Sequence, residues 1–171
     1  MPYKSIDAIL SELQAATPPR LVRFVPTYDP DESEKRELFM PPALHGWLYQ
    51  GSRKKGRDFS ANIRAFLGKY VKGAEVDNEH YMKNWIGEVW ELRVQNQRKG
   101  ERVRIFGAFA KQDAFVAFFQ RPRSGINDPR WKEATGRTVD EWDKLFPPGR
   151  RVGARPFSNC VSSKYFDVHE G

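Results

Sequence analysis

The fold is decided by one alternating stretch of sequence, Val-Trp-Glu-Leu-Arg-Val-Gln-Asn at residues 89–96. Apolar and polar side chains take turns along it, so that one side carries Trp90, Leu92 and Val94 and the other carries Glu91, Arg93 and Gln95. Residues two apart in a β-strand point to the same face of a sheet. The stretch is therefore predicted to be a half-buried strand with a polar outer side.

Two more strands are predicted after this one. In residues 102–110, Arg102 and Arg104 alternate with apolar residues before the run becomes apolar on both faces. Residues 114–119 are apolar on both faces throughout, which suits a central strand covered on both sides. Residues 88–123 are therefore expected to form antiparallel strands that present arginines.

Helices are predicted on both sides of these strands along the chain. Apolar residues recur at helical spacing after Ser5, a suitable N-cap, and again in residues 59–70. A further helix is expected at residues 43–49, after Pro41 and Pro42 have broken any earlier one. Cap signals at Asp128-Pro129 and Thr138 predict a last helix, broken near Gly136.

The chain is expected to form one domain, because 171 residues are enough for one core and few for two. Its core is predicted at about residues 20–146, with an N-terminal helix in residues 1–19 and a C-terminal extension in residues 147–171. Residues 20–25 are expected to be a strand that ends at Pro26, and residues 165–168 a short strand in the extension.

The composition indicates which kinds of partner the chain would bind. Lys and Arg total 29 against 22 for Asp and Glu, and this excess of positive charge favours nucleic acid, the ribosome or an acidic protein as a partner. A single cysteine, Cys160, excludes an intramolecular disulfide. The sequence has neither a signal peptide nor an apolar run of bilayer length, so a cytoplasmic protein that does not enter the membrane is expected.

No metal or cofactor is expected. The three histidines are far apart in the sequence, and Cys160 has no neighbouring ligand at a metal-site spacing. The glycine-rich loops of nucleotide-binding folds and the nucleophile elbow of α/β-hydrolases are missing from the sequence.

Cations on the predicted strands form the candidate site, namely Arg93, Arg102, Arg104, Arg121 and Arg123. Adjacent antiparallel strands could bring these guanidinium groups to one phosphate chain. The alternative is an ordinary solvated sheet face on which Glu91 pairs one arginine. A second basic cluster, Arg53, Lys54, Lys55 and Arg57, is either a phosphate-contacting arm or a solvated loop. The tryptophans Trp85, Trp90, Trp131 and Trp142 are expected to pack in or against the core.

Three motifs carry a resemblance to a known family. Residues 82–94 read Met-Lys-Asn-Trp-Ile-Gly-Glu-Val-Trp-Glu-Leu-Arg-Val, residues 104–106 read Arg-Ile-Phe, and residues 115–119 read Phe-Val-Ala-Phe-Phe. In this order, after a helix and a polar link, they resemble the RelE/ParE toxin superfamily, above all its phage-associated branch. The resemblance covers about residues 59–125, with residues 21–25 matching the family's first strand.

The resemblance implies an α+β fold in which helices pack on a small, twisted, mainly antiparallel sheet. Many members of the family cleave messenger RNA in the ribosomal A site, others inhibit gyrase, and most are neutralised by an antitoxin. By position, Arg93, Arg104, Arg121 and Arg123 match the cations that surround the scissile phosphate in the ribonuclease members.

The residues that match the family do not supply a general base or a general acid. Cleavage through the RNA 2′-hydroxyl needs a base and an acid, and arginines are poor bases because they stay protonated. Neither tyrosine nor histidine follows shortly after Arg123, and Glu91, His80 and Tyr165 do not match family positions.

Two functions therefore stay open. The first is a RelE-like toxin-type protein that acts on RNA or the translating ribosome, including as a messenger RNA endoribonuclease. The second is a non-catalytic inhibitor or adaptor, of phage or bacterial origin, that binds a host protein. A module that binds duplex DNA is disfavoured, because no recognition helix follows a tight turn.

Overall fold

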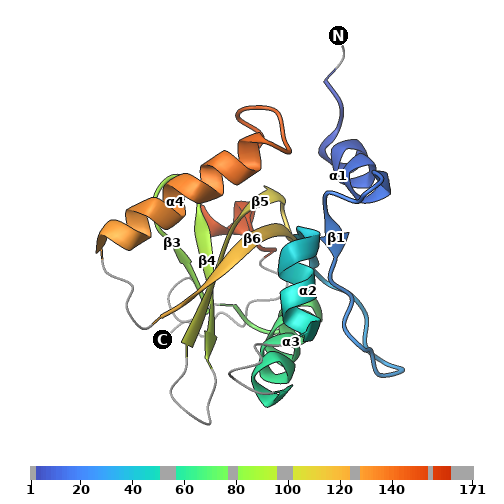
Figure 1. Cartoon of the computed structure of the whole chain (residues 1–171). Helices are drawn as coiled ribbons and strands as arrows, with labels where there is room; N and C mark the ends of the chain where they lie inside the picture. The colour runs from blue at the N-terminus through green and yellow to red at the C-terminus, as the bar shows by residue number, and fades with distance from the viewer. Residues whose placement is uncertain are drawn as a thin grey trace.

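The computed structural model describes residues 3–50, 57–76, 81–95, 102–123, 128–153 and 156–162. In this part of the chain, helices cover both faces of a mainly antiparallel sheet (Figure 1). The predicted meander is present as β4 (Trp90–Gln95), β5 (Arg102–Lys111) and β6 (Ala114–Pro122). The expectation of an α+β fold is confirmed at this level.

Three shorter strands complete the sheet, β1 (Val22–Arg23), β2 (Glu37–Met40) and β3 (Met82–Asn84). The strand order is β1-β2-β6-β5-β4-β3. The pair β2 and β6 is parallel, and every other neighbouring pair is antiparallel. The long strands β5 and β6 thus lie in the middle of the sheet, which explains why their central residues are apolar on both faces.

The strand that lies beside β6 was not predicted from the sequence. The strand predicted at residues 20–25 is reduced to the two residues of β1, at the edge of the sheet. The place next to β6 belongs to β2, whose residues Leu38, Phe39 and Met40 are buried on both faces. The sequence of β2 is a short, continuous apolar run between charged residues and prolines. It lacks the alternation of apolar and polar residues that would distinguish a strand.

The helices follow the predicted ones closely, as α1 (Ile6–Ala15), α2 (Pro42–Gln50), α3 (Arg57–Val71) and α4 (Asp128–Asp143). Ser5 caps α1, since its Oγ accepts from the Ala8 N–H at 3.2 Å. Pro42 is the first residue of α2 and does not prevent it, because proline is compatible with the first helical turn.

The predicted break in α4 near Gly136 is wrong. The helix is continuous, and a Cβ at Gly136 would meet nothing within 4 Å, so neither packing nor backbone geometry interrupts it there. Thr138 lies inside the helix instead of capping a second one, and its Oγ1 donates to the Ala134 carbonyl oxygen at 2.8 Å. That bond occupies the hydroxyl that a cap would have used.

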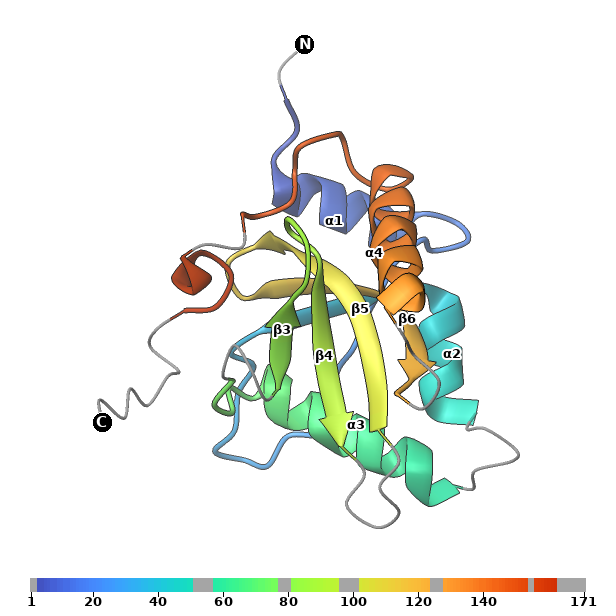
Figure 2. The same ribbon diagram turned by 90° about the vertical axis from the view of Figure 1, so that its left-hand side faces the viewer.

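Two apolar clusters lie on opposite faces of the sheet. The first joins α2 and α3 to residues such as Trp90, Leu92 and Phe115. The second joins α1 and α4 to residues such as Phe106 and Val116. Figure 1 shows the sheet between α4 on one side and α2 with α3 on the other. Figure 2 shows α1 close to the C-terminal part of α4, with β4 pointing away from them and β5 running back toward them.

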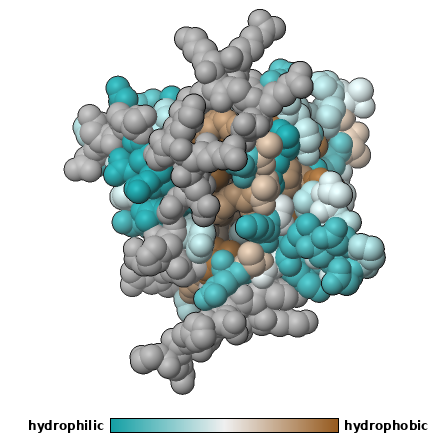
Figure 3. Space-filling model, turned by 90° about the horizontal axis from the view of Figure 1, so that it is seen from below, coloured by the Kyte–Doolittle hydropathy of each residue, from teal (hydrophilic) through white to brown (hydrophobic). Residues whose placement is uncertain are grey.

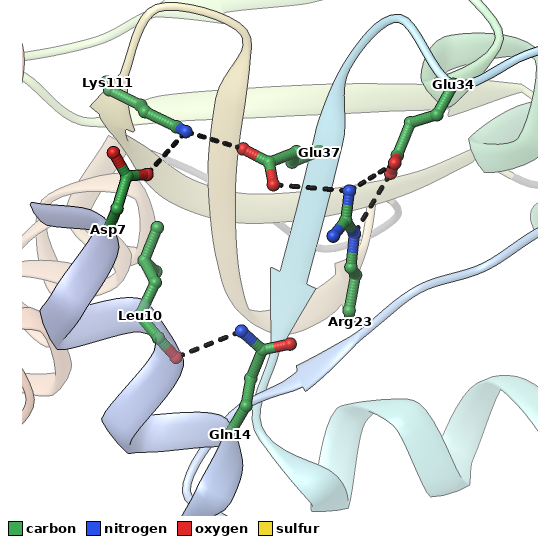
Figure 4. A network of polar contacts seen from close by, with 7 residues as sticks. All are labelled: Asp7, Leu10, Gln14, Arg23, Glu34, Glu37 and Lys111. Carbon is green, nitrogen blue, oxygen red and sulfur yellow. Dashed lines mark hydrogen bonds and ion pairs between the residues drawn. The ribbon is translucent and has the colours of Figure 1, made fainter.

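A polar network fastens α1 to the sheet (Figure 4). The Lys111 Nζ lies 2.6 Å from Asp7 Oδ1 on α1 and 3.0 Å from Glu37 Oε2 on β2. Glu37 Oε1 lies 3.3 Å from Arg23 Nη2, and Arg23 also pairs with Glu34. Single exposed ion pairs contribute little, but this network fixes the position of α1 over the second apolar cluster.

Two further features concern the surface and the helices. Seen from below, hydrophilic residues lie around a central group of apolar ones (Figure 3). In the described ranges, every helix is too short or too polar to span a bilayer.

Candidate functional site

Strand register brings three predicted arginines into one line. Arg93 on β4 is opposite Arg104 on β5, and Arg104 is opposite Arg121 on β6. Residues directly opposite in an antiparallel pair share a face, and neighbouring strands lie about 4.8 Å apart. These three residues, hereafter the arginine row, therefore form a line of cations on the face that also carries Phe106 and α4.

Two more arginines lie beside the arginine row. The Arg123 N–H donates to the Arg102 carbonyl oxygen at 2.7 Å, so these two residues continue the pairing of β5 with β6 past Arg104. Both side chains are exposed. All five arginines that the sequence placed on the strands therefore gather in one region of the sheet.

Glu91 is the anion at the centre of this region. Its side chain is fully buried, its Oε1 accepts from Arg93 Nε at 2.7 Å, and the same oxygen lies 3.7 Å from Arg104 Nε. The sequence suggested that Glu91 pairs one arginine, whereas it contacts two. One carboxylate shared between two guanidinium groups leaves the arginine row with a net positive charge.

Arg104 is the residue that differs most from expectation. Its place on an exposed strand face is wrong, because only 5% of the residue is exposed. Its Nε and Nη1 are buried and have no hydrogen-bond partner. Burial lowers the pKa of the Arg104 guanidinium to about 10; Glu91 opposes this change, and Arg93, Arg123 and Arg102 add to it. Arg104 therefore stays charged at neutral pH, with buried donors that lack acceptors.

The outer end of the row is open. The Arg121 side chain is 43% exposed, and its Nη2 lies 3.6 Å from Glu133 Oε1 on α4. An incoming anion could therefore meet Arg121 first and extend toward the buried guanidinium of Arg104. Buried polar groups without partners are rare in folded proteins, and each one needs a physical reason.

Aromatic side chains from α4 and the sheet border the arginines. Trp131 stacks on Trp85 with ring centroids 4.7 Å apart, and Arg123 lies over the Trp131 ring at 5.9 Å. Trp90 and Trp142 are fully buried, which confirms their core role. Trp85 is only partly buried. Sequence reasoning missed this pairing, since nothing in the chain's period shows that α4 would place Trp131 against Trp85.

The structure does not describe the side chains of the remaining predicted site residues. Arg53, Lys54 and Lys55 fall outside the described residues, as do His80 and Tyr165. Arg57 is the first residue of α3, and its side chain is not described. Within the described ranges, no group of three or more metal-ligating side chains could hold an ion.

The chemistry of the site is that of an anion receptor. Guanidinium groups bind phosphate and carboxylate oxygens through two parallel hydrogen bonds, and they are less strongly hydrated than ammonium groups. Comparison of the chain with family models, curated proteins and solved structures found no match.

Proposed function

We propose that this chain is a RelE-like, toxin-type protein that binds RNA, free or on the translating ribosome, through the arginine row. The observation that carries the proposal is the register of Arg93, Arg104 and Arg121 across three adjacent strands. Three guanidinium groups in line suit a chain of phosphates better than a single small anion. The sequence resemblance to RelE-type toxins supports the same choice.

The unsatisfied donors of Arg104 support a phosphate ligand in particular. A phosphodiester oxygen could accept from Nη1, which is buried without a partner, once the side chains that cover it move aside. Such a charge-assisted hydrogen bond is stronger in a buried place than in water. Glu91 would keep its contact with Arg93 Nε while the ligand binds.

The arginine row could also assist cleavage. In the reaction, the RNA 2′-oxygen attacks phosphorus, the bond from phosphorus to the 5′-oxygen breaks, and a 2′,3′-cyclic phosphate and a 5′-hydroxyl result. Arg104 and Arg121 would stabilise the extra negative charge on phosphorus in the transition state. The 2′-proton must go to a base, and the leaving oxygen must receive a proton.

Glu91 is the carboxylate nearest to this chemistry, but its position suits another role. It is fully buried and already in contact with two arginines. We therefore assign it to positioning: it orders Arg93 and Arg104 before the ligand arrives. An endoribonuclease would have to receive its base from outside this group or move Glu91 outward.

The second function, a non-catalytic inhibitor or adaptor that binds a host protein, is favoured by that same burial. An acidic surface of a partner could pair with Arg121, Arg102 and Arg123 without any proton transfer. In either role we propose a cytoplasmic protein with RNA, the ribosome or a host protein as its target, and with an antitoxin as a further partner.

Expression under a tightly controlled promoter tests the proposal. Growth, translation and messenger RNA 5′ ends are followed for the wild-type chain, for Arg121→Gln, and for Lys69→Gln, which removes an exposed charge from α3 on the opposite face. Growth arrest with new RNA ends, relieved by Arg121→Gln alone, is expected for a ribonuclease.

The outcomes separate the two functions. Arrest with intact RNA and recovery of one host protein in pull-down, both lost in Arg121→Gln, would favour the adaptor. Normal growth, intact RNA and no RNA binding by the purified chain would contradict the proposal that it acts on RNA.

A further inference from the structure

A pair of stacked indoles lies beside the arginine row and takes no part in the contacts described for it. The rings of Trp85 and Trp131 are 4.7 Å apart at their centroids and inclined by 18°. Trp131 also contacts Phe106 at 5.5 Å, and Phe106 stacks on Phe119 at 5.3 Å. A continuous layer of rings therefore runs under α4 from β6 to the segment after β3.

Trp85 is the outermost member of this layer. It is partly buried, whereas Trp90 and Trp142 are fully buried. One face of its ring is taken by Trp131, so the Lys83 ammonium, 4.5 Å from the ring centroid, lies over the other face. The contact over that face is made by a charged side chain. A cation–π contact at a partly exposed site contributes little and is easily displaced.

Strand register connects Trp85 to the arginine row. Lys83 is opposite Glu91 on β4, and Glu91 is opposite Phe106 on β5. Arg93 of the arginine row lies two residues after Glu91 on β4. Trp85 lies two residues after Lys83, and because β3 and β4 are antiparallel, this offset is in the opposite direction. Two steps of two residues along a strand amount to about 13 Å. A short single-stranded segment bound at the arginine row could therefore reach the indole.

We propose that Trp85 is a stacking platform for one nucleobase of a single-stranded RNA whose phosphates are bound at the arginine row. The inference rests on the proposed function. On binding, the base takes the place of the Lys83 ammonium over the indole, and Lys83 turns to the phosphate of the same nucleotide. Trp131 supports the indole from behind and keeps its plane fixed.

A nucleobase fits this place better than other ligands. Each base has an aromatic face, and it arrives with a phosphate that offers the displaced lysine a stronger partner than an indole. Stacking of this kind tolerates every base, so the site would set the position of the strand without selecting a sequence.

Affinity for a short single-stranded RNA, measured by fluorescence anisotropy at several salt concentrations, tests the platform. Trp85→Leu should weaken binding about 5- to 100-fold, and Trp85→Phe should keep most of the affinity. The slope of log affinity against log salt should stay unchanged in Trp85→Leu, because no phosphate contact is lost. Lys83→Met should reduce that slope by about one.

Two controls keep the test sharp. Trp47→Leu makes the same substitution in the cluster on the opposite face of the sheet and should leave RNA affinity unchanged. In the wild-type chain, an abasic site moved along the RNA should weaken binding at one position, and this holds even if Trp85→Leu fails to fold.

The failure of this inference differs from the failure of the proposed function. A wild-type chain that does not bind RNA would remove the proposed function and the platform together. RNA binding that is weakened by Arg121→Gln but is unaffected by Trp85→Leu and by every abasic position would overturn the platform alone.

Discussion

Two buried arginines in this molecule have opposite surroundings. Arg36, just before β2, is 1% exposed, and its Nη1 donates to the carbonyl oxygens of Tyr70 at 2.9 Å and Ala74 at 2.7 Å. Its guanidinium also lies over the Tyr70 ring at 5.2 Å, and its Nε lies 3.9 Å from Asp113 Oδ1. The fold supplies two backbone carbonyl acceptors to the Nη1 of this cation, at the carbonyl end of α3.

Arg104 is also buried, at 5% exposed, but it lies among other cations. Its carboxylate, Glu91, is shared with Arg93, and two of its nitrogen donors have no acceptor. A buried cation that donates to backbone carbonyl oxygens joins parts of the structure, whereas one that shares a single carboxylate with a second cation costs stability. We infer that Arg36 serves the fold, and the proposed function assigns Arg104 to a ligand.

The largest effect is expected from Arg36→Met. The substitution leaves the Tyr70 and Ala74 carbonyl oxygens without their donor and Asp113 without its cation. Breaking a buried charged contact of this kind costs about 3 kcal/mol or more. Urea unfolding measures the loss, and the RNA affinity of the folded fraction should stay unchanged. A stable Arg36→Met variant with weakened RNA binding would reverse the roles assigned to the two arginines.

Cys160 gives a second readout of the Arg36 region, since its carbonyl oxygen accepts from the Asp113 N–H at 2.9 Å. Burial raises the pKa of the Cys160 thiol to about 12 from 9.0, so the folded chain should resist alkylation at pH 8. Arg36→Met should speed alkylation. Because the pKa is higher in the folded chain, the thiol's contribution to the unfolding free energy is complete below pH 9.0 and is lost as the pH rises toward about 12.

The next largest effect is expected from Glu91→Gln. The amide keeps the shape of the side chain but removes the negative charge between Arg93 and Arg104, so two neighbouring guanidinium groups repel each other without a counter-ion. We expect a loss of about 2 to 3 kcal/mol in unfolding free energy, recovered in part by added phosphate or sulfate. Wild-type stability in the Glu91→Gln variant would show that the carboxylate does not hold the row.

Arg104→Met should separate stability from binding. Replacing a poorly satisfied buried cation with an apolar side chain of similar length should change the unfolding free energy by less than about 1 kcal/mol. The loss of one charge-assisted contact should weaken RNA binding about 10- to 100-fold. A double-mutant cycle with Glu91→Gln should show strong coupling between the two sites. A large loss of stability in Arg104→Met would mean that Arg104, like Arg36, serves the fold.

The sequence predicted those strands and helices whose apolar side chains recur at a regular spacing. The alternation in residues 89–96 and 102–105 predicted β4, the start of β5 and the arginines that share a face. Helical spacing predicted α1 and α3. These signals are local, because a strand or helix places its side chains through its own backbone geometry.

What the sequence could not show depends on contacts between distant segments. The burial of Arg104 follows from the register of β4 with β5, which sets Glu91 beside it. The place of β2 next to β6 follows from parallel pairing of two segments that two helices and three strands separate along the chain. The stack of Trp85 on Trp131 follows from the position of α4. Periodicity describes one segment at a time, so it does not give any of these contacts.

The smallest change in stability is expected from Arg121→Gln, at the open end of the row. Its contact with Glu133 is an exposed ion pair, so the unfolding free energy should change by less than about 0.5 kcal/mol. RNA affinity should still fall several-fold, and the salt slope should decrease by about one, because one phosphate contact is lost. Lys69→Gln removes the same charge from the opposite face and should leave the slope unchanged. If both variants lowered the slope equally, the binding would depend on overall charge rather than on the arginine row, and the contrast between Arg36 and Arg104 would lose its functional meaning.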